Sequence, residues 1–262
     1  MQEREVLAEI RGEAMWITLN RPAAMNSISP GVIAGINAAL DEAEQHSTLR
    51  AVVLTGTGRA FCAGADLKFV RSETGSENDG AANFLGSLLM LLNRIEAFPR
   101  PVIAAVNGMA LAGGLELVLC CDLVYAARSA RFGDAHANYG LLPGGGGSVR
   151  LPRKIGPTRA KYLMYTGEFV SATAMETAGL VNHVADDDEL PSSVADLVAK
   201  ISTKSPLGLA RMKALVNDGL EQPAEVALRQ ELLVSALHEH SEDLREGLNA
   251  FHEKRAPRFT GR

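Results

Sequence analysis

The chain has 262 residues, of which 47% are hydrophobic and 22% are charged, the proportions of an ordinary soluble globular protein. This length suits one large α/β domain or a core with an appendage, and the formal net charge of -5 argues against an extended nucleic-acid surface. The charged N-terminus lacks the apolar region of a signal peptide, and no apolar run reaches the ~18 residues of a membrane span. We therefore expect a cytoplasmic protein with neither nucleic-acid nor membrane partners.

A strand hairpin is expected at the N-terminus. Residues 6–10 and 15–19 have the composition of short strands, and Gly12 lies in the turn between them. Pro22 ends the second strand, because proline cannot donate a hydrogen bond to a sheet ladder.

A helix and a buried strand follow. Ser29 as the N-cap and Pro30 at the first helical position predict a helix that runs to about residue 46. Residues 51–54 predict a short buried strand. The order strand, helix, strand indicates a parallel crossover.

The glycine-rich segment 55–68 does not match the dinucleotide-binding pattern G-x-G-x-x-G, because Phe61 occupies the position of the third glycine. It has no Gly-Lys-Ser/Thr either, which excludes a P-loop. The loop ends in Ala63-Gly64-Ala65, and Asp66 is placed to cap a helix from Leu67 onward. This turn therefore presents backbone N–H groups at the start of a helix.

A second turn of this kind lies in the segment 101–122. It begins as an apolar strand over residues 102–106, tightens at Gly113-Gly114, and continues as an apolar helix that carries Glu116 as its one carboxylate. An ionised carboxylate among apolar residues costs several kcal/mol unless it is paired or used. Two turns rich in backbone N–H donors can stabilise an oxyanion that forms on a carbonyl compound. Together with Glu116, which can move a proton or activate water, they predict chemistry through such an oxyanion.

The remaining elements are recognised by proline, serine and glycine at their ends. We expect a polar loop over 72–80, a loop or short helix over 134–147, short strands over 123–126, 131–133 and 181–184, and helices over 81–98, 148–154, 157–166, 171–178, 191–202, 206–218, 223–240 and 241–252.

Other reactive side chains have simpler interpretations. Cys62, Cys120 and Cys121 have no zinc spacing, so we expect buried free thiols and no metal, and for Cys62 we favour packing over a nucleophilic role. A lone loop histidine such as His136 is most often a solvated side chain. The sequence has no G-x-S-x-G elbow, which argues against a serine hydrolase.

Several of these stretches resemble the crotonase (enoyl-CoA hydratase/isomerase) superfamily. The resemblance covers nearly the whole chain and is carried by Leu19-Asn20-Arg21-Pro22 with Asn26, the segments 58–68 and 105–122, Phe132-Gly133, and the segment 142–151. It implies an α/β fold, a spiral of ββα turns over residues 1–204 that holds an acyl-CoA site. It also implies a helical region over residues 205–262 that assembles a homotrimer or homohexamer. The implied ligand is a coenzyme A thioester as substrate, with no cofactor.

The resemblance also implies roles for individual residues. The backbone N–H groups of Ala65 and Gly113 would form an oxyanion hole, and Glu116 matches the first catalytic glutamate of the family's hydratases, which activates water. His136 stands where those hydratases have their second glutamate, and it can donate or accept a proton near pH 7. The expected substrate-binding residues are Arg21, Ala24, Asn26, Ala63, Asp66, Leu67 and Gly114.

The implied activity is hydration of a 2-enoyl-CoA to a 3-hydroxyacyl-CoA through an enolate. Because His136 departs from the family pattern, two alternatives stay open: hydrolytic C–C cleavage or isomerisation in the same scaffold, with His136 as the base. A third alternative is a non-catalytic acyl-CoA binder, although the retained Glu116 argues against it.

Overall fold

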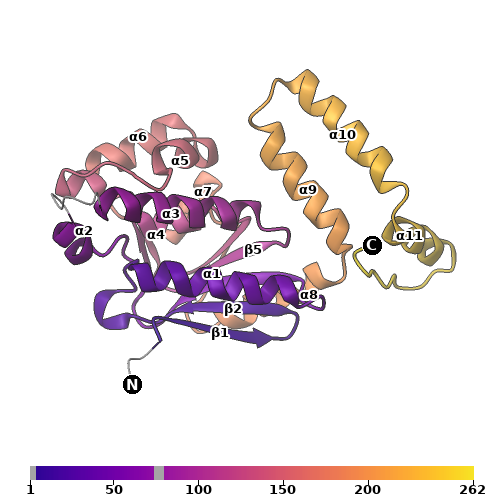
Figure 1. Ribbon diagram of the computed structural model, residues 1–262, viewed down its shortest axis with the longest axis horizontal. Helices are drawn as coiled ribbons and strands as arrows, with labels where there is room; N and C mark the ends of the chain where they lie inside the picture. The colour runs from indigo at the N-terminus through magenta and orange to yellow at the C-terminus, as the bar shows by residue number, and fades with distance from the viewer. Residues whose placement is uncertain (1–3, 74–79) are drawn as a thin grey trace.

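A mostly parallel sheet forms the centre of the molecule in a computed structural model that describes residues 4–73 and 80–262 (Figure 1). Within those residues its strands are, in spatial order, β1 (Val6–Arg11), β2 (Ala14–Leu19), β3 (Ala51–Gly56), β5 (Val102–Val106), β7 (Leu123–Ala127) and β10 (His183–Ala185). β1 and β2 form the predicted antiparallel hairpin, and every later pairing in this sheet is parallel. All five residues of β5 are buried, as expected for a strand covered on both faces.

A second, smaller sheet lies beside the first and is made of very short strands. They are, in spatial order, β4 (Ala60–Cys62), β6 (Met109–Leu111), β8 (Arg131–Gly133) and β9 (Val170–Ser171). The chain alternates between the sheets, passing from β3 to β4, from β5 to β6 and from β7 to β8. This alternation confirms the expected spiral of ββα turns. The sequence did not predict β4, β6 and β9, which are too short to show an alternating pattern.

Helices cover both sheets. Their bounds are α1 (Pro30–Gln45), α2 (Leu67–Glu73), α3 (Gly80–Ala97), α4 (Gly113–Leu119), α5 (Gly147–Ile155), α6 (Pro157–Thr166), α7 (Ala172–Ala178) and α8 (Leu190–Ser202), with 3₁₀ turns η1 (Pro22–Ala24) and η2 (His136–Tyr139). The predicted serine cap of α1 is confirmed, because Ser29 Oγ accepts a hydrogen bond from the Val32 N–H at 3.1 Å. Most of the polar loop predicted over residues 72–80 lies outside the described residues.

The C-terminal part is helical and lies to one side of the sheets, where α9 (Pro206–Gly219), α10 (Ala224–His238) and α11 (Glu242–His252) are visible in Figure 1. Lys213 ties α9 to the core through its ammonium, which lies 2.8 Å from the Asp122 carboxylate. These helices confirm the predicted ones to within two residues at each end. The boundary between residues 204 and 205 stays a prediction.

Candidate active site

The two turns predicted to present backbone N–H donors lie against each other; the first donor turn is Ala63-Gly64-Ala65 and the second is Gly113-Gly114. Ile28 pairs with Ala65 in an isolated parallel bridge, which fixes the first turn beside β4. A Cβ added to Gly113 would lie 3.3 Å from the Ala65 amide nitrogen, so the second turn begins next to the first. Within the described part of the chain, neither the Ala65 nor the Gly113 N–H donates a hydrogen bond. Both groups are therefore free to donate to a bound oxygen.

Glycine is required where these turns approach other backbone atoms. A Cβ on Gly114 would lie 2.0 Å from the Cys62 carbonyl oxygen, so α4 packs on β4 only without a side chain there. Gly64 has a φ of +103°, a conformation that L-residues rarely adopt. The glycines thus bring the Ala65 and Gly113 amides together.

The Glu116 carboxylate is buried one turn into α4, with 2% of the residue exposed. Its Oε1 accepts hydrogen bonds from the backbone N–H groups of Gly145 and Gly147, at 2.9 and 2.8 Å. A Cβ on Gly145 would lie 2.6 Å from Glu116 Oε2, so the glycine run lets the backbone close around the carboxylate. Hydrogen bonds to an ionised group offset much of its desolvation cost, which explains how a glutamate is kept in apolar packing.

His136 is not a solvated loop side chain, and that expectation was wrong. The residue is 9% exposed at the start of η2, and its Nδ1 lies 3.1 Å from the Oδ1 of Asp134, which is 2% exposed. Burial acts to lower the pKa of His136, but the hydrogen bond to Asp134 and the charges of Asp134 and Glu116 outweigh it and raise the pKa above its ordinary value.

Asp134 was missed in the sequence analysis. The available signal was its position two residues before His136, where a carboxylate and an imidazole can reach each other across a tight turn. The turn is closed by a hydrogen bond from the His136 N–H to the Asp134 carbonyl oxygen at 2.8 Å.

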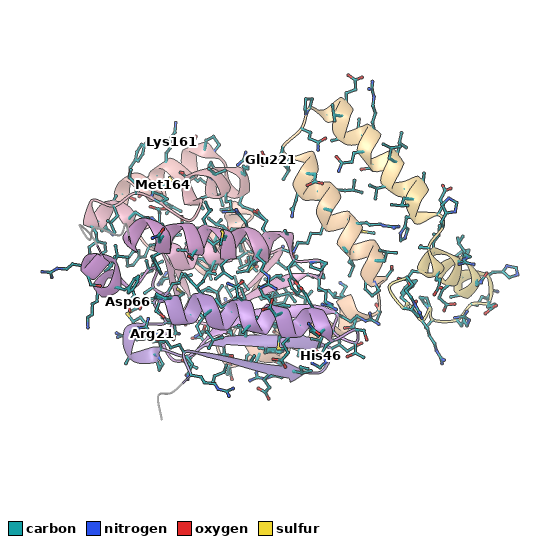
Figure 2. The ribbon with its side chains drawn as sticks, in the orientation of Figure 1. Arg21, His46, Asp66, Lys161, Met164 and Glu221 are labelled. Atoms are coloured by element: carbon teal, nitrogen blue, oxygen red, sulfur yellow. The ribbon has the colours of Figure 1, made fainter. Side chains whose placement is uncertain are left out.

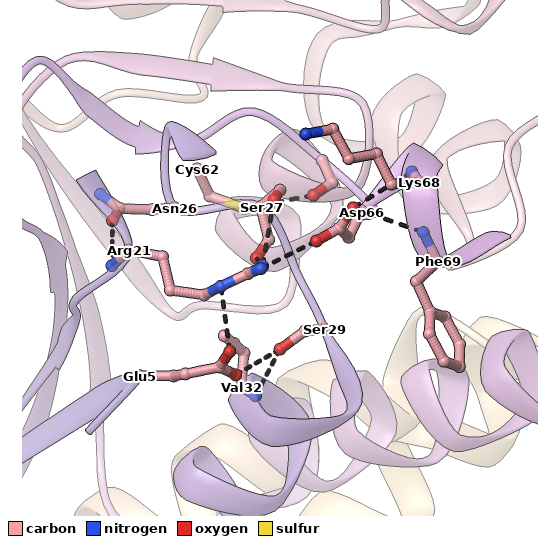
Figure 3. Close-up of polar contacts among 11 residues, drawn as sticks. Glu5, Arg21, Asn26, Ser27, Ser29, Val32, Cys62, Asp66, Lys68 and Phe69 are labelled. Carbon is pink, nitrogen blue, oxygen red and sulfur yellow. Dashed lines mark hydrogen bonds and ion pairs between the residues drawn. The ribbon is translucent and has the colours of Figure 1, made fainter. Parts of the chain in front are cut away.

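Arg21 lies beside Asp66 (Figure 2), and its guanidinium is bound by neighbouring groups of the fold (Figure 3). One terminal nitrogen donates to the Asp66 carboxylate at 2.8 Å, the other to the Ser27 carbonyl oxygen at 2.6 Å, and Nε lies 3.1 Å from Glu5 Oε1. Burial acts to raise the pKa of Asp66, but the hydrogen bonds and charge of Arg21, with backbone N–H donors of α2, lower it. Because Asp66 directly follows Ala65, this network anchors the first donor turn.

Asn26 is fully buried and also acts within the fold. Its Oδ1 accepts a hydrogen bond from the Arg21 N–H at 2.8 Å, and its Nδ2 donates to the carbonyl oxygens of Thr57 and Ala60 at 2.9 and 2.7 Å. The side chain therefore ties the loop after β2 to the loop after β3 and to the start of β4.

The other predicted substrate-binding residues lie near this network. Ala24 is exposed in η1, Leu67 is 45% exposed at the start of α2, and Ala63 is half-buried between them in sequence. The Ala63 N–H donates to the Met25 carbonyl oxygen at 3.0 Å, which joins the η1 segment to the first donor turn. Their role as a binding surface stays a prediction.

The cysteines take no part in this arrangement. Cys62, Cys120 and Cys121 are buried free thiols, as predicted. Burial raises the pKa of Cys62 to about 12, so at neutral pH it holds almost no nucleophilic thiolate. Among the described residues, no group of His, Cys, Asp or Glu side chains is arranged to hold a metal ion, and no helix there is long and apolar enough to cross a membrane.

Comparison with known proteins gives a consistent set of relatives. The family model described as enoyl-CoA hydratase/isomerase matches residues 9–262. The chain is 36% identical to crotonyl-CoA hydratase of Syntrophomonas wolfei, over 99% of both chains, and 36% identical to 1,2-epoxyphenylacetyl-CoA isomerase of Escherichia coli, over 98% of both. The crystal structure of an enoyl-CoA hydratase from Bacillus anthracis superposes with a TM-score of 0.92 at 35% identity, covering 98% of this chain and all of that one.

Proposed function

The chain belongs to the enoyl-CoA hydratase/isomerase family, and from that premise we propose that it adds water across the double bond of a 2-enoyl-CoA to give a 3-hydroxyacyl-CoA. One observation carries the proposal: the backbone N–H groups of Ala65 and Gly113, which donate no hydrogen bond within the described residues, lie together at the start of the helix that holds the buried carboxylate of Glu116. This arrangement suits a substrate whose carbonyl oxygen gains negative charge while a water molecule is deprotonated nearby.

The thioester oxygen is placed between the Ala65 and Gly113 amides. When hydroxide adds to C3, the electron pair of the double bond moves toward the carbonyl and forms an enolate. Backbone N–H groups are fixed by the fold, so they would stabilise the charge on this oxygen without reorganisation. Loss of one such donor costs on the order of 10²-fold to 10³-fold in kcat, which makes a pair a large part of the catalysis.

Glu116 acts as the base for the attacking water. Its Oε1 is occupied by the Gly145 and Gly147 amides, whereas Oε2 accepts no hydrogen bond within the described part of the chain. That free oxygen is the one that would take a proton from water. His136 acts as the second proton carrier and delivers a proton to C2 of the enolate. The reaction needs the thioester, water and these side chains, and no cofactor or metal.

We also propose that the working form is a homotrimer or homohexamer in the cytoplasm. The C-terminal helices expose a group of large apolar side chains, namely Met212, Val216, Leu220, Leu228, Leu232, Leu233 and Leu237. Large apolar side chains exposed in such number along two neighbouring helices are often covered by another chain. The buried free thiols fit a reducing compartment. Light scattering would show a mass of three or six chains if this is correct, and a monomer if it is not.

The test of the activity is the loss of the enoyl absorbance of crotonyl-CoA in the presence of the wild-type protein, Glu116→Gln and His136→Ala. We expect turnover in the wild type and a fall of about 10²-fold to 10⁴-fold in each variant, the range for removal of a general acid or base. Full turnover by Glu116→Gln would rule out the assigned base. Binding of crotonyl-CoA without any turnover would instead support a non-catalytic binder.

A further inference from the structure

Asp134 is a buried carboxylate with no role in the reaction as proposed above. Its side chain is 3% exposed and that of His136 is 10% exposed, so both members of the pair are removed from bulk water. A buried carboxylate costs free energy unless it is paired, and among the described residues His136 is the side chain that pairs with Asp134. The geometry of this pair leaves Nε2 as the nitrogen of His136 that can meet a ligand.

We propose that Asp134 is a positioning residue: it accepts the Nδ1–H of His136 and thereby presents Nε2 as the nitrogen that protonates the substrate at C2. The proposal rests on the hydratase function proposed above. A histidine whose one ring nitrogen donates to a carboxylate has its tautomer and ring orientation fixed, as in catalytic triads. Asp134 itself touches no reacting atom.

The backbone holds the pair in place on both sides. The Leu141 N–H donates to the His136 carbonyl oxygen at 3.0 Å, and the Asn138 side chain donates to the Gly167 carbonyl oxygen at 2.9 Å, which docks η2 on the end of α6. Ala135, between Asp134 and His136, has a φ of +58°. Such a left-handed alanine is uncommon and is kept only where the surroundings enforce it.

The charged groups around His136 come from few elements. Asp134 precedes η2, and Glu116 lies on α4. On α5, Arg150 is paired with Glu96 at 2.7 Å and donates to the Gly145 carbonyl oxygen. The ionisable side chains of α6, which packs on η2, are exposed, and they are Arg159, Lys161, Tyr162 and Tyr165. Asp134 contacts the imidazole, and the charges of Asp134 and Glu116 both favour its cationic form.

With Glu116 and His136, the protons taken up and released during hydration balance. The reaction starts with ionised Glu116 and cationic His136. Glu116 takes a proton from water, the hydroxide forms the C3–O bond, and Nε2 of the imidazolium gives its proton to C2. After product release, a proton passes from Glu116 to His136 through solvent and restores the starting state. One water molecule is added, and nothing is oxidised or reduced.

The pairing has a consequence for the pH dependence. Because Asp134 and Glu116 together hold the pKa of His136 above its ordinary value despite burial, the imidazolium persists to higher pH than in a free histidine. Hydration needs that form, so kcat/KM falls as the pH rises through the pKa of His136. Loss of the Asp134 charge moves this fall to lower pH.

The experiment compares wild type, Asp134→Asn and Asp134→Ala by two readouts, with the exposed Asp188→Asn as a matched control. The first is nitrogen-15 NMR of the histidine rings, with the His136 signal identified by its absence in His136→Gln. The second is kcat/KM for crotonyl-CoA from about pH 5 to pH 10. Asparagine keeps an oxygen that can accept the Nδ1–H but has no charge, whereas alanine removes both.

In the wild type we expect the neutral ring of His136 to carry its proton on Nδ1. In Asp134→Asn the pKa of His136 and the alkaline limb of kcat/KM should fall together, with about a tenfold loss at alkaline pH for each unit of pKa. Asp134→Ala should lose activity at every pH, and Asp188→Asn should match the wild type.

An Nε2–H tautomer in the wild type would overturn the proposal even if neither variant folds. The proposal would also be overturned if folded Asp134→Asn kept the wild-type pKa of His136 and the wild-type alkaline limb of kcat/KM. If the wild type hydrates normally in that case, the hydratase function stays intact. Failure of the hydratase function would show differently, as wild-type protein that turns over no enoyl-CoA at any pH.

Discussion

Alanine at position 145 is the sharpest perturbation of the carboxylate site that the structure offers. The new Cβ would lie 2.6 Å from Glu116 Oε2 and 2.6 Å from Leu92 Cδ1. Leu92 can rotate away, because the contact is with the end of its side chain. Glu116 has less freedom, because its Oε1 is held by two backbone N–H groups of the same loop.

The size of the effect follows from these distances. Ordinary contact begins at 3.4 Å, so the carboxylate or the loop has to move by about 0.8 Å. A misplacement of about 1 Å in a reacting group can cost on the order of 10²-fold in rate. We therefore expect Gly145→Ala to lower kcat by roughly 10²-fold, with little change in KM, because the thioester contacts are untouched. Overpacking should lower the free energy of unfolding by about 1–3 kcal/mol.

The assay is steady-state hydration of crotonyl-CoA together with urea unfolding. Gly86→Ala is the matched control, since Gly86 is an exposed helical glycine with open space where the Cβ would be. Alanine there should leave kcat unchanged and raise stability by up to about 1 kcal/mol. If folded Gly145→Ala has a kcat within about threefold of wild type, the precise position of the Glu116 carboxylate is not needed for catalysis and the role assigned to it is refuted.

Three further substitutions test the surroundings of the site. Arg21→Lys keeps the charge but loses the fork that joins Asp66 to the Ser27 carbonyl oxygen. We expect kcat/KM to fall by about tenfold or more as the first donor turn loosens, and wild-type kinetics would contradict that. Asn26→Ala leaves buried donors and acceptors unpaired, so urea unfolding should show a loss of about 2–4 kcal/mol, with a loss under about 0.5 kcal/mol as the contrary result. Cys62→Ala should retain kcat within about threefold, because the thiol holds almost no thiolate at neutral pH; inactivation with an intact fold would point to a nucleophile after all.

The elements that the sequence predicted well are those whose signals are local. Ser29 and Ser171 cap helices that begin where their side chains imply, because a cap is decided within one turn. The buried strand β5 and the two donor turns were also evident, since an apolar run followed by glycines needs no distant partner to be recognised.

The features that could not be predicted from the sequence depend on contacts between residues that are distant in the chain. The strands β4, β6 and β9 form because each pairs with a strand that is distant in the sequence, and not because of their own composition. The Glu116 carboxylate is held by amides of Gly145 and Gly147 from a later turn of the spiral, so the sequence of that segment predicted only a loop or short helix. The burial of His136 was hidden for the same reason, whereas its pairing with Asp134, two residues earlier, left a local signal.

The most direct test of the proposed hydration is product analysis by mass spectrometry and NMR after reaction of crotonyl-CoA and longer 2-enoyl-CoA thioesters in doubly labelled water. Hydration gives a 3-hydroxyacyl-CoA that carries one oxygen-18 at C3 and one deuterium at C2, and we expect wild type to form it and Glu116→Gln to form far less. An isomer without oxygen-18, a product of C–C cleavage, or bound thioester that is never converted would contradict it.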